Sequence, residues 1–176
     1  FAVIASDVMD GIKSDAVIDT LSGLLNRRGF EPRARSELAR QKAGKPAAII
    51  LSDLDHFKSI NDLFGHSSGD LIIRRFSEVF REKSPGDAIM ARLGGEEFAI
   101  LLPSGAAVAA DELAEEIRTA FKQIAPDIVS GEASPTASFG VAIAGENENL
   151  QALMERADRA LYRAKGNGRD CVHLAD

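Results

Sequence analysis

Residues 88–102 read A-I-M-A-R-L-G-G-E-E-F-A-I-L-L, two apolar runs separated by a Gly-Gly pair and two glutamates. Tight hairpin turns need positive φ angles, which glycine adopts without a steric penalty. The stretch therefore predicts a β-hairpin with strands over residues 88–93 and 97–102. The carboxylates that follow the turn, Glu96 and Glu97, would then lie at one end of this hairpin.

The segments on either side of the hairpin alternate between strand-like and helix-like patterns. The apolar run Ala47–Leu51, which ends at Ser52-Asp53, indicates a buried strand. Two further segments resemble strands, and five carry apolar residues at helical spacing. We therefore expect an α/β fold with helices flanking a central mixed sheet of about five strands. The expected strands beyond the hairpin cover 47–53, 133–144 and 171–174, and the expected helices cover 27–43, 56–63, 68–83, 106–125 and 150–165.

Composition excludes several classes of protein. The chain has 176 residues, 45% hydrophobic and 27% charged, as expected for one globular domain. Its net charge of −6 argues against a nucleic acid partner. The single cysteine, Cys171, excludes an intrachain disulfide and suits a reducing compartment. No apolar run approaches the ~20 residues of a membrane span, so we expect no membrane contact by this chain.

The start of the chain predicts an upstream region. The first residue is Phe1 rather than Met, so we expect the sequence to be a piece of a longer protein. Residues 1–18 carry Ile4, Val8 and Ile12 at four-residue spacing, which is typical of the end of a linker helix. The domain itself would cover residues 19–176.

Polar residues concentrate between Asp53 and Asp70, directly after the expected buried strand. If the hairpin pairs beside this strand, Asp53 would meet Glu96 and Glu97. Convergent oxygen ligands suit a hard cation such as Mg²⁺, which keeps waters and substrate phosphates in its shell. An EF-hand is excluded because Phe57 occupies a position that requires Asp or Asn.

A second motif points to a different chemistry. Residues 65–69 read G-H-S-S-G, which matches the G-x-S-x-G elbow of hydrolases, with His173 downstream as a candidate base. That elbow requires a strand before the serine, whereas residues 57–64 are expected to be helical. We therefore interpret Ser67 or Ser68 as a helix cap.

Four sequence blocks together resemble the GGDEF family of diguanylate cyclases. The signature is R-L-G-G-E-E-F over 92–98, in its GGEEF form. Residues 19–28 are similar to the family's entry motif D-x-L-T-G-L-x-N-R-R, with Ser22 in place of Thr. Residues 53–70 match the block D-x-D-x-F-K-x-x-N-D-x-x-G-H-x-x-G-D, and residues 137–142 and 157–165 resemble the later blocks. The resemblance covers about residues 19–174 and implies the palm-like fold of nucleotidyl cyclases.

The resemblance implies that the domain condenses two GTP into cyclic di-GMP and releases two pyrophosphates. Mg²⁺, with Mn²⁺ as the alternative, would be bound by Asp53, the Leu54 carbonyl and Glu96, with Glu97 also at the metal–phosphate site. Glu96 would also be the base that accepts the proton of the ribose 3′-hydroxyl. This arrangement is chemically reasonable, because a divalent cation neutralises phosphates and orients in-line attack on the α-phosphorus.

The remaining substrate contacts are likewise carried over from the family. Asn61 and Asp70 would bind the guanine edge, with His66 in the same nucleotide pocket. The β- and γ-phosphates would be held by side chains and by two backbone N–H groups. The side chains are those of Lys58, Lys165 and Arg169, and the N–H groups are those of His56 and Phe57.

The reaction implies a homodimer, because each domain holds one GTP. A cytoplasmic location is expected, and the full-length protein could carry a membrane anchor upstream. The alternative function is a non-catalytic GTP-binding regulatory module, against which the intact Asp53, Glu96 and Glu97 argue.

One family feature is missing from this sequence. Many relatives carry an inhibitory product site, R-x-x-D, that ends five residues before the Gly-Gly signature. Pro85 and Ala88 occupy its Arg and Asp positions here, and neither supplies a charge. Asp87 and Arg92 are out of register with the motif. We therefore expect no inhibition by cyclic di-GMP through this site.

Overall fold

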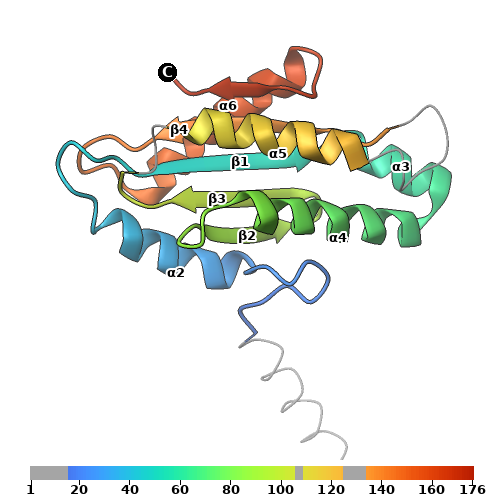
Figure 1. Cartoon of the computed structure of the whole chain (residues 1–176), viewed down its shortest axis with the longest axis horizontal. Helices are drawn as coiled ribbons and strands as arrows, with labels where there is room; N and C mark the ends of the chain where they lie inside the picture. Colours follow the sequence, from blue (N-terminus) through green and yellow to red (C-terminus); the bar gives the residue numbers. More distant parts are fainter. Residues whose placement is uncertain (1–15, 106–108, 125–133) are drawn as a thin grey trace, which may run out of the picture.

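A computed structural model describes residues 16–105, 109–124 and 134–176. Its centre is a five-stranded sheet in the order β2-β3-β1-β4-β5 (Figure 1). All neighbouring strands are antiparallel except β4 and β5, which are parallel. The α/β fold with a mixed sheet of five strands is thus confirmed. The strands are β1 (Ala48–Leu54), β2 (Ile89–Gly94), β3 (Glu97–Leu102), β4 (Ala137–Ile143) and β5 (Val172–Leu174).

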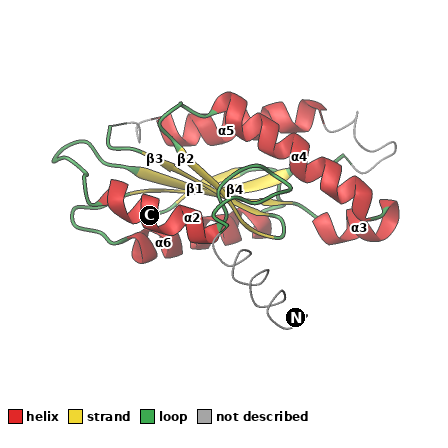
Figure 2. Cartoon of the chain, turned by 90° about the horizontal axis from the view of Figure 1, so that it is seen from below, coloured by secondary structure: helices red, strands yellow, loops and turns green. Residues whose placement is uncertain are grey.

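Helices cover both faces of the sheet (Figure 2). Helices α4 and α5 pack on one face, where five phenylalanines, among them Phe76 and Phe98, lie within one buried cluster. Helices α2 and α6 pack on the other face over Ile49, Leu51 and Leu101. Both faces of β1 are therefore buried, which explains its continuous apolar sequence. The helices are α2 (Arg27–Leu38), α3 (Phe57–Phe64), α4 (His66–Lys83), α5 (Ala110–Ile124) and α6 (Leu150–Gly166).

The hairpin differs in detail from the prediction. Gly94 is the last residue of β2 and pairs with Glu97, so the two turn residues are Gly95 and Glu96. The register shifts between Arg92 and Gly94, and Gly95 has a φ of 48°. The turn therefore places Gly95 and Glu96, rather than Gly94 and Gly95, at the tip of the hairpin.

The first helix is shorter than its periodicity predicts. We expected a helix to residue 43, but α2 ends at Leu38. Beyond it, the N–H groups of Arg40 and Gln41 bond to carbonyls three residues back, and the side chain of Gln41 accepts a hydrogen bond from the N–H of Ala47. These contacts close a turn that leads into β1.

The segment before α2 is only partly described. The expected linker helix over residues 1–18 lies mostly outside the described residues. Residues 16–18 are not helical, because Ile18 forms an isolated bridge with Leu25 and the Val17 carbonyl accepts from Asn26. The ends of two other expected segments, residues 106–108 and 125 of one helix and 133 of one strand, also lie outside the described ranges.

Candidate active site

The end of β1 brings Asp53 against the tip of the hairpin. Asp53 pairs with Glu97 in the β1–β3 register, and the next N–H, that of Leu54, donates to the Glu96 carbonyl at 3.2 Å. The structure therefore brings together four of the residues predicted at the metal site. Asp53 is 8% exposed and Glu96 is half-buried.

The hairpin tip is held by the entry motif. Arg92 donates from Nε to the Gly95 carbonyl at 2.9 Å and from Nη1 to Asp19 at 3.1 Å. Burial alone would raise the pKa of Asp19, but hydrogen bonds from Ser22 and Arg92 hold it below its ordinary value. Arg92 thus supports the turn that carries Glu96.

A lysine from α6 neutralises Asp53. The Lys165 Nζ lies 2.8 Å from Asp53 Oδ2. Burial raises the pKa of Asp53, the Lys165 ammonium opposes that rise, and the neighbouring charges of Glu96 and Glu97 add to it. Asp53 is therefore a desolvated carboxylate that depends on a nearby cation for its charged state.

The donor set fits a divalent cation. The Asp53 carboxylate, the Leu54 carbonyl and the Glu96 carboxylate are oxygen donors of the kind that Mg²⁺ prefers. Among the described residues no three His, Cys, Asp or Glu side chains are already gathered into a metal cluster. Lys165 supplies a positive charge at Asp53, and Glu97, whose side chain is 58% exposed, lies 3.9 Å from Arg27.

Helices α3 and α4 form the second part of the site. Asn61 lies on α3, and its Oδ1 is buried without a hydrogen-bond partner. A Cβ at Gly69 would lie 2.0 Å from this oxygen, so the Asn61 amide rests against the first turns of α4. Asp70 follows directly and is exposed, as is His66 at the start of α4. A buried, unpaired acceptor next to an exposed carboxylate can receive the N–H groups of a bound base.

The loop between β1 and α3 and the loop after α6 lie at the same end of the fold. His56 is exposed and has a left-handed backbone with φ 55°, which starts α3 at Phe57. Phe57 packs partly into the core, whereas Lys58 is exposed. Arg169 is exposed in the loop that leads from α6 to β5.

Asp55 was missed as a site candidate by sequence reasoning. It is 3% exposed and accepts hydrogen bonds from Thr136 Oγ1 at 2.7 Å, Ser138 Oγ at 2.7 Å and the Asp170 N–H at 3.1 Å. The sequence feature that could have identified Asp55 is its position as the second aspartate of an Asp-x-Asp pair. The partners could not be found from spacing, because they are more than 80 residues away in the chain.

The structure argues against the hydrolase reading. Residues 57–64 form α3, so a helix and not a strand precedes Ser67 and Ser68. The predicted cap is wrong, because α4 already begins at His66 and its N-cap residue is Gly65, so both serines lie inside the helix. Ser68 Oγ instead donates to the Phe64 carbonyl at 3.0 Å, which is a structural contact between the two helices. The Pro85 and Ala88 positions form a turn before β2, in which the Ala88 N–H donates to the Pro85 carbonyl.

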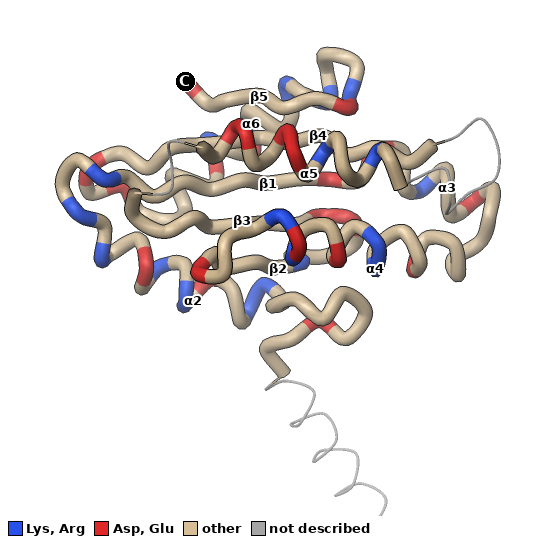
Figure 3. The backbone as a smooth tube through the Cα atoms, viewed as in Figure 1, with Lys and Arg blue, Asp and Glu red and all other residues tan. Residues whose placement is uncertain are grey.

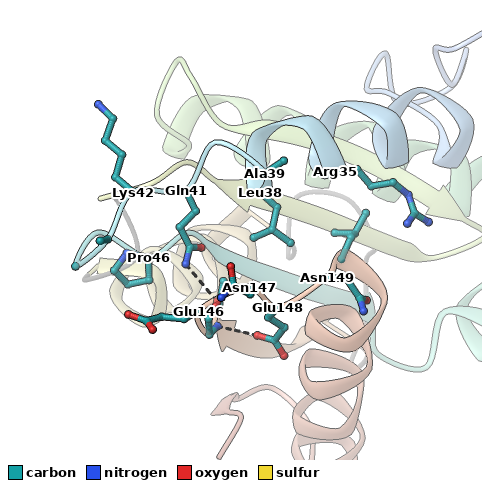
Figure 4. A pocket seen from close by; sticks show the side chains of 15 residues that line it. Arg35, Leu38, Ala39, Gln41, Lys42, Pro46, Glu146, Asn147, Glu148 and Asn149 are labelled. Carbon is teal, nitrogen blue, oxygen red and sulfur yellow. Dashed lines mark hydrogen bonds between the residues drawn. The ribbon is translucent and has the colours of Figure 1, made fainter.

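A large open groove lies elsewhere, before the start of β1 and after the end of β4 (Figure 4). Its volume is about 1000 Å³, and its lining includes Arg35, Lys42 and Glu148 but none of the predicted site residues. Glu148 accepts from the Gly145 N–H and pairs with Arg156 at 2.9 Å. The carboxylate of Glu148 is therefore satisfied within the protein.

Charges on α2 are mixed (Figure 3). Glu31 lies within 4 Å of both Arg27 and Arg35, so the basic residues of this helix are partly neutralised on a solvated face.

Among the described residues, no helix is both long and apolar enough to cross a membrane.

Comparison with known proteins identifies a family model and several relatives that match most of this chain. The family model described as "Diguanylate cyclase, GGDEF domain" matches residues 16–171. The chain is 38% identical to diguanylate cyclase DgcP of Pseudomonas aeruginosa over 93% of its own length and 24% of DgcP. It is also 38% identical to diguanylate cyclase VdcA of Vibrio cholerae, over 92% of this chain and 48% of VdcA. The chain thus spans 24% to 48% of the length of these two relatives.

Solved structures that resemble this chain come from the same family. The coiled coil and GGDEF domain of DgcB from Caulobacter crescentus, in complex with c-di-GMP, superposes with a TM-score of 0.84 at 31% identity and covers 99% of this chain and 93% of that one. Diguanylate cyclase SiaD of Pseudomonas aeruginosa, in complex with its activator SiaC, has a TM-score of 0.83 at 32% identity, covering 99% of this chain and 67% of SiaD. The chain therefore belongs to the GGDEF family of diguanylate cyclases, and its fold is that of the family's nucleotidyl cyclase domain.

Proposed function

We propose that this domain condenses two GTP into cyclic di-GMP and two pyrophosphates. The observation that carries the proposal is the buried Asp53 at the end of β1, paired with Lys165 and placed beside the Glu96 hairpin tip. A desolvated carboxylate with adjacent oxygen donors and a cationic partner suits binding of a metal–triphosphate.

The metal would be held by Asp53, the Leu54 carbonyl and Glu96, with Glu97 beside them. Mg²⁺ is proposed, with Mn²⁺ as the alternative, and when bound it would neutralise the phosphates and orient the α-phosphate for attack. Lys165 would then shift from Asp53 to the phosphates, since both interactions use the same ammonium group.

Cationic side chains and N–H groups would hold the triphosphate. Lys58 in α3 and Arg169 in the loop between α6 and β5 are exposed and would join Lys165 at the β- and γ-phosphates. The N–H groups of His56 and Phe57 lie at the start of α3, where helix N–H groups favour an anion.

Guanine would bind between α3 and α4. The buried Asn61 Oδ1 and the Asp70 carboxylate would accept the N1–H and N2–H₂ groups of guanine, which adenine lacks, and His66 would lie in the same pocket. A site built to hydrogen-bond a substrate group rejects an analogue that lacks it, so ATP is expected to be a poor substrate.

In the reaction, the 3′-hydroxyl of one GTP attacks the α-phosphorus of the other. A new P–O bond forms, the bond from the α-phosphorus to the bridging oxygen breaks, and pyrophosphate leaves. Glu96 would accept the hydroxyl proton. A second such transfer closes the ring, so two domains must face each other as a homodimer.

We also propose that feedback by the product acts only in competition with GTP. Pro85 and Ala88 offer no charge to the phosphates of cyclic di-GMP, whereas the product shares guanine with the substrate.

The experiment is product analysis after incubation with GTP and Mg²⁺, for the wild type and for Glu96→Gln. The amide cannot accept the proton and is a poor metal ligand, so turnover should fall by at least 100-fold. Glu82→Gln, at an exposed position of α4, is the matched control and should retain wild-type turnover. Product formation by Glu96→Gln at the wild-type rate would contradict the role of this residue.

A further inference from the structure

The loop between α6 and β5 has an unusual backbone. Gly168, Arg169 and Asp170 have φ angles of 104°, 64° and 47° in succession. Left-handed conformations of residues other than glycine cost about 1 kcal/mol or more each and persist where surrounding contacts fix them. Arg169 is one of the two strained residues and one of the proposed phosphate contacts.

Asp170 supplies these contacts with both its backbone and its side chain. Its N–H donates to Asp55 Oδ2, and its carboxylate lies 2.5 Å from Arg118 Nη1 and 2.6 Å from Lys122 Nζ on α5. The Arg169 N–H donates to the Ala164 carbonyl at 3.1 Å. The loop is therefore bound to three separate parts of the fold.

The Asp55 carboxylate accepts three hydrogen bonds from within the protein. Oδ1 accepts from Ser138 and Oδ2 accepts from both Thr136 and Asp170. Its own N–H donates to the Thr136 carbonyl at 2.8 Å. A buried carboxylate satisfied by neutral donors in this way serves to fix its neighbours.

We propose that Asp55 and Asp170 are positioning residues that hold Arg169 in its left-handed conformation, next to Lys165, for contact with the β- and γ-phosphates of GTP. This inference rests on the proposed function. Asp55 directly follows β1, two residues after Asp53, and its carboxylate accepts the Asp170 N–H. It thereby fixes the phosphate-binding loop relative to the proposed metal site.

The test measures binding of a non-hydrolysable GTP analogue and of GMP by calorimetry with Mg²⁺. Asp55→Ala removes all three accepted hydrogen bonds and should weaken the analogue about tenfold, as for other residues that orient a ligand-binding group. GMP lacks the β- and γ-phosphates and should bind within twofold of the wild type. Asp55→Asn can keep an oxygen towards Asp170 while its amide donates to Ser138, so it should restore analogue binding.

A second pair of variants changes Asp170, which is only partly buried, and provides the test if Asp55→Ala does not fold. Asp170→Ala loses the pairs with Arg118 and Lys122 and disfavours the left-handed backbone, so it should lower analogue binding without affecting GMP. Asp170→Asn, a residue that tolerates this conformation, should be milder. Asp87→Asn, at an exposed position before β2, is the matched control and should bind as the wild type does.

A double-mutant cycle separates positioning from a general structural effect. In an Arg169→Ala background, Asp55→Ala should cost less than twofold in analogue affinity, because the group that it positions is gone. Equal losses for the analogue and GMP, or an undiminished loss in that background, would overturn the proposal. A wild type that binds the analogue but makes no cyclic di-GMP would overturn the proposed function alone, while one that binds neither nucleotide would overturn both.

Discussion

Substitution of Gly69 by alanine should separate guanine recognition from stability. Gly69 lies inside α4, where alanine is intrinsically favoured over glycine by about 1 kcal/mol. The new Cβ would lie 2.0 Å from Asn61 Oδ1, whereas an ordinary contact begins at 3.4 Å. The deficit is about 1.4 Å and falls on a side chain, so Asn61 can relieve it by rotating away from α4.

The rotation should remove Asn61 from guanine while the fold remains intact. Loss of one hydrogen bond to a buried acceptor corresponds to about 1–3 kcal/mol, or roughly 5- to 150-fold in affinity. We expect the KM for GTP to rise within this range and the preference for GTP over ATP to fall. The melting temperature should stay within about 4 °C of the wild type, the shift that 1 kcal/mol produces in a domain of this size.

The assay is initial-rate kinetics with GTP and ATP, combined with thermal unfolding. Gly86→Ala is the matched control, because a Cβ there meets no atom within 4 Å. A wild-type KM and an unchanged GTP preference in Gly69→Ala would refute the assignment of Asn61 to guanine.

Two further predictions concern the sheet and its buried charge. Gly140→Ala would place a Cβ 2.1 Å from the Ala157 carbonyl of α6. Because a backbone carbonyl cannot rotate away, the free energy of unfolding measured by denaturant titration should fall by about 1–3 kcal/mol or more. A stability equal to that of Gly86→Ala would contradict this close packing. Asp53→Asn should abolish turnover yet raise the melting temperature of the metal-free protein at pH 7, because the amide puts no charge into this buried position. The sign follows from the raised pKa: the wild type loses stability as pH rises from the ordinary aspartate pKa through its raised value in the folded state, and the amide does not. Thermal scans at pH 4 and pH 7 would check this, and a larger advantage of the variant at pH 4 than at pH 7 would be inconsistent with it.

The fold was predictable where local signals agree. The continuous apolar run of β1, the glycine-marked hairpin and the four-residue spacing in α4 and α6 all indicated the elements that form. The predicted ends of helices were wrong where they depend on side-chain contacts. After α2 ends at Leu38, the side chain of Gln41 accepts a hydrogen bond from the Ala47 N–H, and periodicity contains no information on that contact.

The site was predictable in its residue types but not in its pairings. The sequence predicted Asp53 beside Glu96 only on the condition that the hairpin pairs with the strand before Asp53, and the structure shows this pairing. The sequence did not predict that Lys165 would pair with Asp53, nor that Asp55 would bind the Asp170 loop. Both pairings join segments over 100 residues apart, and such contacts are determined by packing of the whole domain.

The most direct test of the central claim is the stoichiometry of products from GTP and Mg²⁺, measured by chromatography with mass detection. If the Asp53–Glu96 site is a diguanylate cyclase centre, each cyclic di-GMP should be accompanied by two pyrophosphates, with a rate per domain that rises with protein concentration as dimers form. GTP that binds but is recovered unchanged, across concentrations at which the protein is dimeric, would contradict the account and indicate a non-catalytic GTP-binding module.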